Sequence, residues 1–128
     1  MNLGQRTADL KTALDAKPGA VATAMSPPRA ATPNILIYKV MGKMFAILTI
    51  RGGENVILKC DPHLAEILRG QYAGVGHRSH LDRRTWISVS LDADVPAGEI
   101  ERLAAHSYDL VAAKLTRKQK AALAALSS

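Results

Sequence analysis

The feature that most constrains the fold is a run of three short β-prone segments between residues 35 and 60, separated from one another by glycine. The segments read ILIYKV, KMFAILTI and NVILKC, and the connections contain Met41-Gly42 and Arg51-Gly52-Gly53-Glu54. Glycine supplies the positive φ that tight turns need, so two successive hairpins are the simplest interpretation. The sequence therefore predicts a three-stranded antiparallel meander.

Strict alternation in the segment TWISVSL predicts a fourth strand. Its two faces differ in chemistry: Ile87, Val89 and Leu91 share one face, and Trp86, Ser88 and Ser90 share the other. Helices are expected to cover the aliphatic face. Trp86 then lies either exposed on the open face of the sheet or packed, beneath the preceding basic loop or over neighbouring lysine stems.

Four helices are predicted around these strands. A short amphipathic helix over residues 7–16 comes first, and Asp61, followed by a proline, begins a second helix that ends at Gly70. Pro96 begins the longest helix, and a basic helix begins at Thr116, where TRKQ has the form of a capping box. Because strand-helix-strand alternation does not occur, this order favours an antiparallel α+β fold over a Rossmann-like one.

A single domain over residues 1–128 is expected, since this length is close to the commonest domain size. Its fold class is α+β, with two layers: an antiparallel β-sheet, and helices packed on one face of that sheet. Two long loops complete the prediction. Residues 20–34 form a Pro/Ala-rich loop in which prolines forbid a regular helix, and residues 71–84 form a loop that is rich in glycine and then basic.

The charge of the chain indicates the kind of partner it meets. A net charge of +6 and a pI near 9.8 favour encounters with RNA, DNA, anionic lipid or an acidic protein at neutral pH. A single cysteine excludes an intrachain disulfide and suits a reducing compartment. The N-terminus lacks a signal-peptide pattern, and the longest apolar stretch is too short to cross a bilayer. We therefore expect a soluble, cytoplasmic protein without membrane association.

Four segments in the last two-thirds of the chain resemble the MmcQ/YjbR family: YKVMGKMFAIL, LKCDPHLAEILR, HLDRRTWISVSLDADVP and HSYDLVAAKLTRKQKAAL. They occur in the family's order, and as a set they are specific. The resemblance implies a double-wing fold of the frataxin-like (CyaY-like) group, with helices on one side of an antiparallel sheet, and it implies DNA binding. The sequence departs from the family over residues 21–34, which are longer and richer in proline, so no family site is carried over to that loop.

Nucleic-acid binding is the first functional hypothesis. Phosphate binding needs cations gathered on one surface, and Arg or Trp planes stack on unpaired bases. The expected contact surface is the loop over residues 78–84 with the tryptophan that follows it: Arg78, Arg83, Arg84 and Trp86. Lys39 and Lys43 of the first hairpin and Lys59 of the neighbouring strand give it electrostatic support. Whether DNA or RNA is preferred stays open.

Metal binding and catalysis are the alternatives that the sequence disfavours. Cys60-x-x-His63 and His77-x-x-His80 resemble a zinc spacing, but nearby arginines would repel a cation, so a buried cysteine and surface histidines are expected instead. No acidic residue is clearly placed to orient His63 toward Cys60. Asp92 and Asp94 are expected to cap the long helix rather than to act as an acid–base pair. We therefore expect no enzyme activity, no metal and no cofactor.

A protein-interaction module is the remaining hypothesis. In this interpretation, the open face of the sheet around Trp86, Phe45 and the hairpin tips contacts another protein, as frataxin-like folds do. The same surface would then serve a different class of partner. Steep salt dependence of binding would favour nucleic acid over such an apolar contact.

Overall fold

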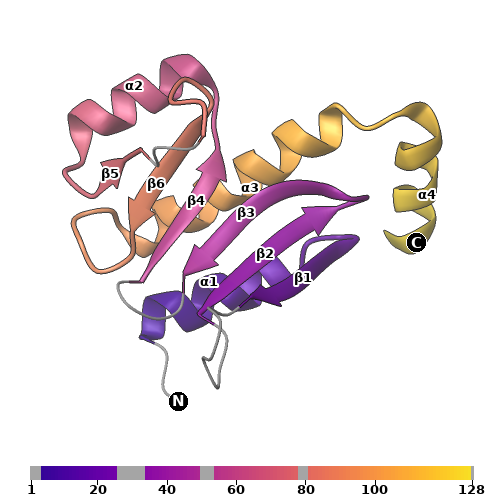
Figure 1. Ribbon diagram of the computed structural model, residues 1–128, viewed down its shortest axis with the longest axis horizontal. Helices are drawn as coiled ribbons and strands as arrows, with labels where there is room; N and C mark the ends of the chain where they lie inside the picture. The colour runs from indigo at the N-terminus through magenta and orange to yellow at the C-terminus, as the bar shows by residue number, and fades with distance from the viewer. Residues whose placement is uncertain (1–3, 26–33, 50–53, 78–80, 128) are drawn as a thin grey trace.

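The computed structural model describes residues 4–25, 34–49, 54–77 and 81–127. Within these ranges the chain forms one six-stranded antiparallel sheet and four helices (Figure 1). The strands lie in the order β1-β2-β3-β4-β6-β5. Their bounds are Ala20–Met25 for β1, Ile35–Val40 for β2, Lys43–Thr49 for β3, Asn55–Lys59 for β4, Val75–Gly76 for β5 and Trp86–Ser90 for β6. The predicted α+β class is confirmed.

The predicted meander is also confirmed. β2 and β3 are joined by a two-residue turn in which Met41 has a φ of 49° and Gly42 a φ of 80°. Positive φ at both central positions matches the right-handed twist of the paired strands. β3 pairs with β4 up to the partners Thr49 and Asn55, and the predicted turn of residues 51–53 lies outside the described residues.

The predicted loop over residues 20–34 is wrong in its first part. Ala20–Met25 forms the edge strand β1, which pairs with β2 along its whole length from Ala20↔Val40 to Met25↔Ile35. The alanines gave no strand signal of their own, but β2 supplies hydrogen-bond partners along that edge. The prolines that excluded a helix come after this strand, and residues 26–33 lie outside the described part of the chain.

The second predicted loop contains a strand as well. Val75–Gly76 forms β5, which pairs with Val89 and Ser88 of β6. Two residues are too few to show a periodicity in the sequence, and their pairing depends on the neighbouring strand rather than on local preference. Of the other described residues of this predicted loop, Gln71 ends α2, residues 72–74 precede β5, and residues 77 and 81–84 lie between β5 and β6.

Two helices cover one face of the sheet, as expected. α1 (Gln5–Asp15) and α3 (Ala97–Ala113) lie behind the sheet in Figure 1, and their apolar residues share a continuous core with the inward side chains of the strands. The largest fully buried side chains of this core include Tyr38, Phe45, Leu48, Leu58 and Ile87. On the face of the sheet toward the viewer in Figure 1, no helix of the described residues lies over the central strands.

The other two helices lie at the margins of the sheet. α2 (Pro62–Gln71) follows β4 directly and packs on β5 and β6, and it continues past the predicted end at Gly70. α4 (Arg117–Ser127) begins with the predicted capping box, since Thr116 N donates to Gln119 Oε1 at 3.0 Å and Gln119 N donates to Thr116 Oγ1 at 3.1 Å. Among the described residues, no helix combines the length and the hydropathy needed to cross a membrane.

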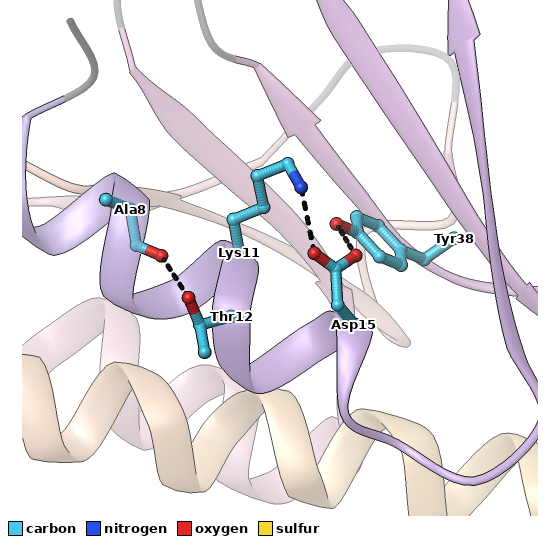
Figure 2. Close-up of polar contacts among 5 residues, drawn as sticks. All are labelled: Ala8, Lys11, Thr12, Asp15 and Tyr38. Carbon is cyan, nitrogen blue, oxygen red and sulfur yellow. Dashed lines mark hydrogen bonds and ion pairs between the residues drawn. The ribbon is translucent and has the colours of Figure 1, made fainter.

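A polar cluster joins the end of α1 to the sheet (Figure 2). The Tyr38 hydroxyl donates to Asp15 Oδ1 at 2.7 Å, and Lys11 Nζ donates to Asp15 Oδ2 at 2.8 Å. Burial tends to raise the pKa of Asp15, but the hydrogen bonds from Lys11 and Tyr38 and the Lys11 charge outweigh it and lower that pKa. Burial, reinforced by Asp15, raises the pKa of Tyr38, so this hydroxyl stays a proton donor.

Candidate nucleic-acid interface

The sheet register brings the predicted contact residues to one end of the sheet. Lys39 lies near the end of β2, Lys43 begins β3, Lys59 ends β4 and Trp86 begins β6. Because these strands alternate in direction, their four positions belong to the same end of the sheet (Figure 1). Arg83 and Arg84 precede β6 at this same end, whereas Arg78 lies outside the described residues. Lys39 and Lys43 are exposed, and Lys59 and Trp86 are partly buried.

A lysine side chain covers the indole ring of Trp86. Trp86 is the direct cross-strand partner of Lys59, and Lys59 Nζ lies 5.9 Å from the centroid of the indole ring. A cation at this distance is attracted by the quadrupole of the ring. Of the two predicted positions for Trp86, the structure has the one in which a lysine packs over it. A nucleobase that stacks on the face of the ring that Lys59 covers would have to displace the lysine.

The open face near Trp86 also contains a buried residue. Ile57 lies one alternation step from Lys59 on the open side of β4 and is only 1% exposed. The register places Ile37, Ile47 and Ile57 in one row across β2, β3 and β4. Phe45, which was predicted to lie on this open face, is instead buried in the core between Tyr38 and Tyr108, because a register shift after Tyr38 changes the alternation in β3.

A tight turn leads into β6. Asp82 accepts hydrogen bonds on its side chain from Arg84 N at 2.9 Å and on its carbonyl from Trp86 N at 3.0 Å. Thr85 O accepts from Cys60 N at 2.8 Å, which ties the turn to the end of β4. The backbone that carries Arg83 and Arg84 is therefore fixed by local hydrogen bonds, and the two side chains project from an ordered support.

Arg69 is the residue that holds this turn against α2. Its Nη2 donates to Arg83 O at 2.6 Å and to Trp86 O at 2.9 Å, and its Nε donates to Gly76 O at 3.4 Å. The sequence analysis missed this role, since Arg69 was only a basic residue in the last turn of a short helix. Its partners are backbone carbonyls from two other segments, so no sequence signal identifies them.

A pocket of about 540 Å³ opens between α2 and this turn. Three arginines and one carboxylate contribute to its wall, and its lining residues are Pro62, His63, Glu66, Arg69, Arg83 and Arg84. Among the described residues, the Arg83 and Arg84 guanidinium groups have no hydrogen-bond or ion-pair partner, whereas Arg69 is engaged with carbonyls. The pocket therefore carries an uncompensated positive charge at its loop side.

The N-terminus of α2 is capped within the chain. Asp61 Oδ2 accepts from His63 N and Leu64 N, each at 3.1 Å, and Pro62 occupies the first turn as the sequence predicted. Burial, followed by the charge of Asp61, raises the pKa of the Cys60 thiol to about 11. A thiol with this pKa stays protonated at neutral pH, which makes it a poor nucleophile and a poor metal ligand.

The residues proposed for the disfavoured zinc spacing do not gather in the described part of the chain. Within that part, no group of three His, Cys, Asp or Glu residues could hold a metal ion together, and His80 lies outside it. His77 Nε2 instead lies 3.0 Å from Leu81 O.

The predicted role of Asp92 and Asp94 is wrong. Pro96 is the N-cap of α3, and no side chain caps that helix. Asp94 instead accepts hydrogen bonds from Ala73 N and Gly74 N, each at 2.8 Å, and these bonds, Gly74 first, lower the pKa of its carboxyl group below 3.8. Asp92 accepts a hydrogen bond from the Ser90 hydroxyl at 3.0 Å. Asp94 thus holds the turn that leads into β5.

Comparison with known proteins places the chain among related sequences. A family model described as YjbR matches residues 15–110. The Uncharacterized protein YjbR of Escherichia coli (strain K12) is 37% identical over 71 residues, which cover 55% of this chain and 60% of that protein. The Uncharacterized protein YbdF of Escherichia coli O157:H7 is 25% identical over 89 residues, or 69% of this chain and 73% of that protein. The chain thus spans only 60% of the length of the YjbR relative that it matches.

Solved structures share the fold. The crystal structure of the Deinococcus radiodurans protein DR2400, a DUF419 domain, has a TM-score of 0.77 and 30% identity, and the match covers 91% of this chain and 86% of that chain. A crystal structure of a Pseudomonas syringae protein has a TM-score of 0.63 and 24% identity over 86% of this chain and 98% of that chain. The second likeness concerns the fold alone.

Proposed function

This chain belongs to the YjbR family, and we propose that it is a nucleic-acid-binding protein without catalytic activity, with DNA as the first polymer to test. The observation that carries the proposal is the pair of guanidinium groups of Arg83 and Arg84, which lack partners among the described residues and stand on a turn fixed by Asp82 and Arg69. Cations held on an ordered backbone bind phosphate oxygens with little loss of conformational freedom beyond that of the side chains themselves.

The surrounding charges support the same proposal. Lys59 lies beside this turn, on the strand next to Trp86, and Lys39 and Lys43 extend the positive charge along the same end of the sheet. The net charge of +6 adds a long-range attraction for polyanions at low ionic strength. In this proposal the lysines and arginines contact phosphates, and Trp86 supports Lys59 rather than serving first as a stacking surface.

Titration with mixed-sequence single-stranded and double-stranded DNA and RNA tests the proposal. Trp86 is the sole tryptophan, and its contact with Lys59 makes its fluorescence a local reporter. We expect binding at low salt and an affinity that falls steeply as salt rises from about 50 to about 200 mM. Absence of binding to all four polymers at low salt would overturn the proposal.

Matched variants locate the contact. Arg83→Ala should weaken binding and reduce the salt slope by about one, since one phosphate contact is lost. Arg102→Ala removes the same charge from α3, where the side chain is 71% exposed and its ion-pair partner among the described residues is Glu99, and it should leave the slope unchanged. Equal effects of the two variants would show that net charge alone drives the association.

A protein partner is the second candidate, and the edge of the sheet favours it. On the open side of β1, Val21 is 62% exposed and Met25 is 51% exposed, next to the row of isoleucines on β2 and β3. Exposed apolar residues of this kind mark contact surfaces in many proteins. Binding through this face should vary little with salt and should be lost in Val21→Asp, whereas binding to nucleic acid should survive that substitution.

A further inference from the structure

We propose that the pocket between α2 and the turn before β6 binds a phosphomonoester, carried either by a free nucleotide or by the 5′ end of a nucleic-acid strand. The strand-end form of this inference rests on the proposed function. The pocket is defined by Pro62, His63, Glu66, Arg69, Arg83 and Arg84. Its volume of about 540 Å³ lies within the range of small-molecule sites, and it is large enough for a nucleotide.

The charge of the pocket favours a phosphomonoester over an internal phosphodiester. Two guanidinium groups without partners among the described residues, those of Arg83 and Arg84, offer more donors than the two non-bridging oxygens of a diester satisfy. A monoester presents three terminal oxygens and a charge of roughly −1.5 to −2 at neutral pH. It also has one free end, so it enters a concave site, whereas an internal phosphate is flanked by sugars on both sides.

The arginines of the pocket have different tasks. Arg69 donates to the carbonyls of Arg83, Trp86 and Gly76, so its side chain is already committed to holding the turn. It adds positive potential to the wall but does not need to change its partners when a ligand binds. Arg83 and Arg84 are left to contact the phosphate, and the fixed turn beneath them sets the spacing of the two side chains.

The opposite wall favours a nucleoside over bare phosphate. Glu66 lies on α2 and contributes the one carboxylate among the described lining residues. A carboxylate repels a phosphate dianion that comes close, but it accepts hydrogen bonds from sugar hydroxyl or base amino groups. Pro62 and His63 offer a ring surface on the same wall, against which a base or sugar packs. The pocket therefore complements a ligand that is anionic at one end and rich in hydrogen-bond donors at the other.

Calorimetric titration of the full chain tests the inference with five probes. Three are small molecules: a nucleoside 5′-monophosphate, the matching nucleoside and inorganic phosphate. The other two are single-stranded DNAs of about twelve nucleotides, one with a 5′-phosphate and one with a 5′-hydroxyl. The monophosphate should bind at least about tenfold more tightly than the nucleoside or inorganic phosphate. If strand ends are the source, the 5′-phosphorylated strand should also bind about tenfold more tightly than the 5′-hydroxyl strand. A bound monophosphate with equal affinities for the two strands identifies a free nucleotide as the source.

The variants connect these preferences to the pocket. The double substitution Arg83→Ala with Arg84→Ala should abolish both preferences, while Arg102→Ala should keep them, and thermal melting should show that all variants are folded. The inference is overturned if the monophosphate binds no better than inorganic phosphate and the two strands bind equally, or if the double variant keeps the preferences. Binding of the 5′-hydroxyl strand at low salt reports on the proposed function separately, so that function can survive when the phosphomonoester pocket fails.

Discussion

Arg69 joins α2 to two other segments through its guanidinium group, and replacing it tests how the basic turn is held. The substitution Arg69→Met keeps a long apolar stem and removes every donor. Three carbonyl groups then lose a partner: those of Arg83, Trp86 and Gly76. The turn that carries Arg83 should loosen, and α2 should lose its polar connection to β5 and β6.

The expected magnitude follows from the geometry. The bonds to Arg83 O and Trp86 O, at 2.6 and 2.9 Å, are short, whereas the bond to Gly76 O at 3.4 Å is too long to add much. Hydrogen bonds from charged groups stabilise proteins by about 1.5–3 kcal/mol each, and the partial exposure of Arg69 places these two at the lower end. We expect the free energy of unfolding to fall by about 2–3 kcal/mol, which corresponds to a Tm lower by roughly 10 °C.

Urea denaturation followed by far-UV circular dichroism measures this loss without relying on the nearby tryptophan. Arg83→Ala is the matched control, because it removes an arginine from the same pocket but leaves the carbonyl that Arg69 binds. Its free energy of unfolding should lie within about 0.5 kcal/mol of the wild type. Binding of nucleic acid should weaken in both variants, in one through loss of support and in the other through loss of contact.

Two results would refute this reasoning. An unchanged free energy of unfolding in Arg69→Met would show that water replaces the three bonds at no cost and that the turn is held by other contacts. Equal destabilisation by Arg83→Ala would show that the Arg83 side chain has a structural partner. Either result would remove the distinction between Arg69 as the supporting arginine and Arg83 as a contact arginine.

Three further substitutions or treatments have expected outcomes. Ser107→Ala removes a buried hydroxyl that donates to Phe45 O at 2.5 Å and accepts from Lys59 N at 2.8 Å. Urea denaturation should show that the free energy of unfolding falls by about 2–4 kcal/mol. A decrease below about 0.5 kcal/mol would contradict these two hydrogen bonds. Cys60, whose pKa is raised to about 11 by burial, should resist a thiol reagent at pH 7 in the native protein and react fully in urea. Asp94 has a lowered pKa in the folded chain, so its stabilising effect is present above the unfolded pKa of 3.8 and is lost as the pH falls through the lower folded pKa. Asp94→Asn should therefore flatten the decrease of Tm on acidification below about pH 4. An unchanged dependence of Tm on pH would exclude this role.

Local signals in the sequence were sufficient to predict the elements whose conformation is determined by residues within the element itself. The turn at Met41 and Gly42 needs positive φ at two successive positions, and the glycine was the residue from which the turn was predicted. The capping box of Thr116 and Gln119 is closed by two reciprocal bonds within four residues, so its pattern and its structure coincide. The meander and the last helix were therefore predicted correctly.

Elements that depend on distant partners could not be predicted in this way. β1 has an alanine-rich sequence and becomes a strand because β2 supplies its hydrogen bonds, and β5 is two residues long and pairs with β6. Phe45 was misplaced because a register shift next to Tyr38 reverses the alternation that a regular strand would have. The same limit applies to Arg69, whose three acceptors come from segments 7 to 17 residues away along the chain.

The arrangement of the arginines explains why counting charges did not define the site. The sequence analysis assigned Arg83 and Arg84 to the contact surface and the lysines to its electrostatic support, but neither the charges nor the strand register predicts a concave site. Arg69 supplies the shape, because its bonds to the turn fix one wall of the pocket against α2, which forms the other. The guanidinium group of Arg69 is satisfied by backbone carbonyls. In our proposal, the groups of Arg83 and Arg84 are therefore the ones that select the phosphate ligand. In our proposal, the described residues at this end of the sheet combine a general attraction for polyanions with a concave site, and the concave site is the part that distinguishes a terminal phosphate from an internal one.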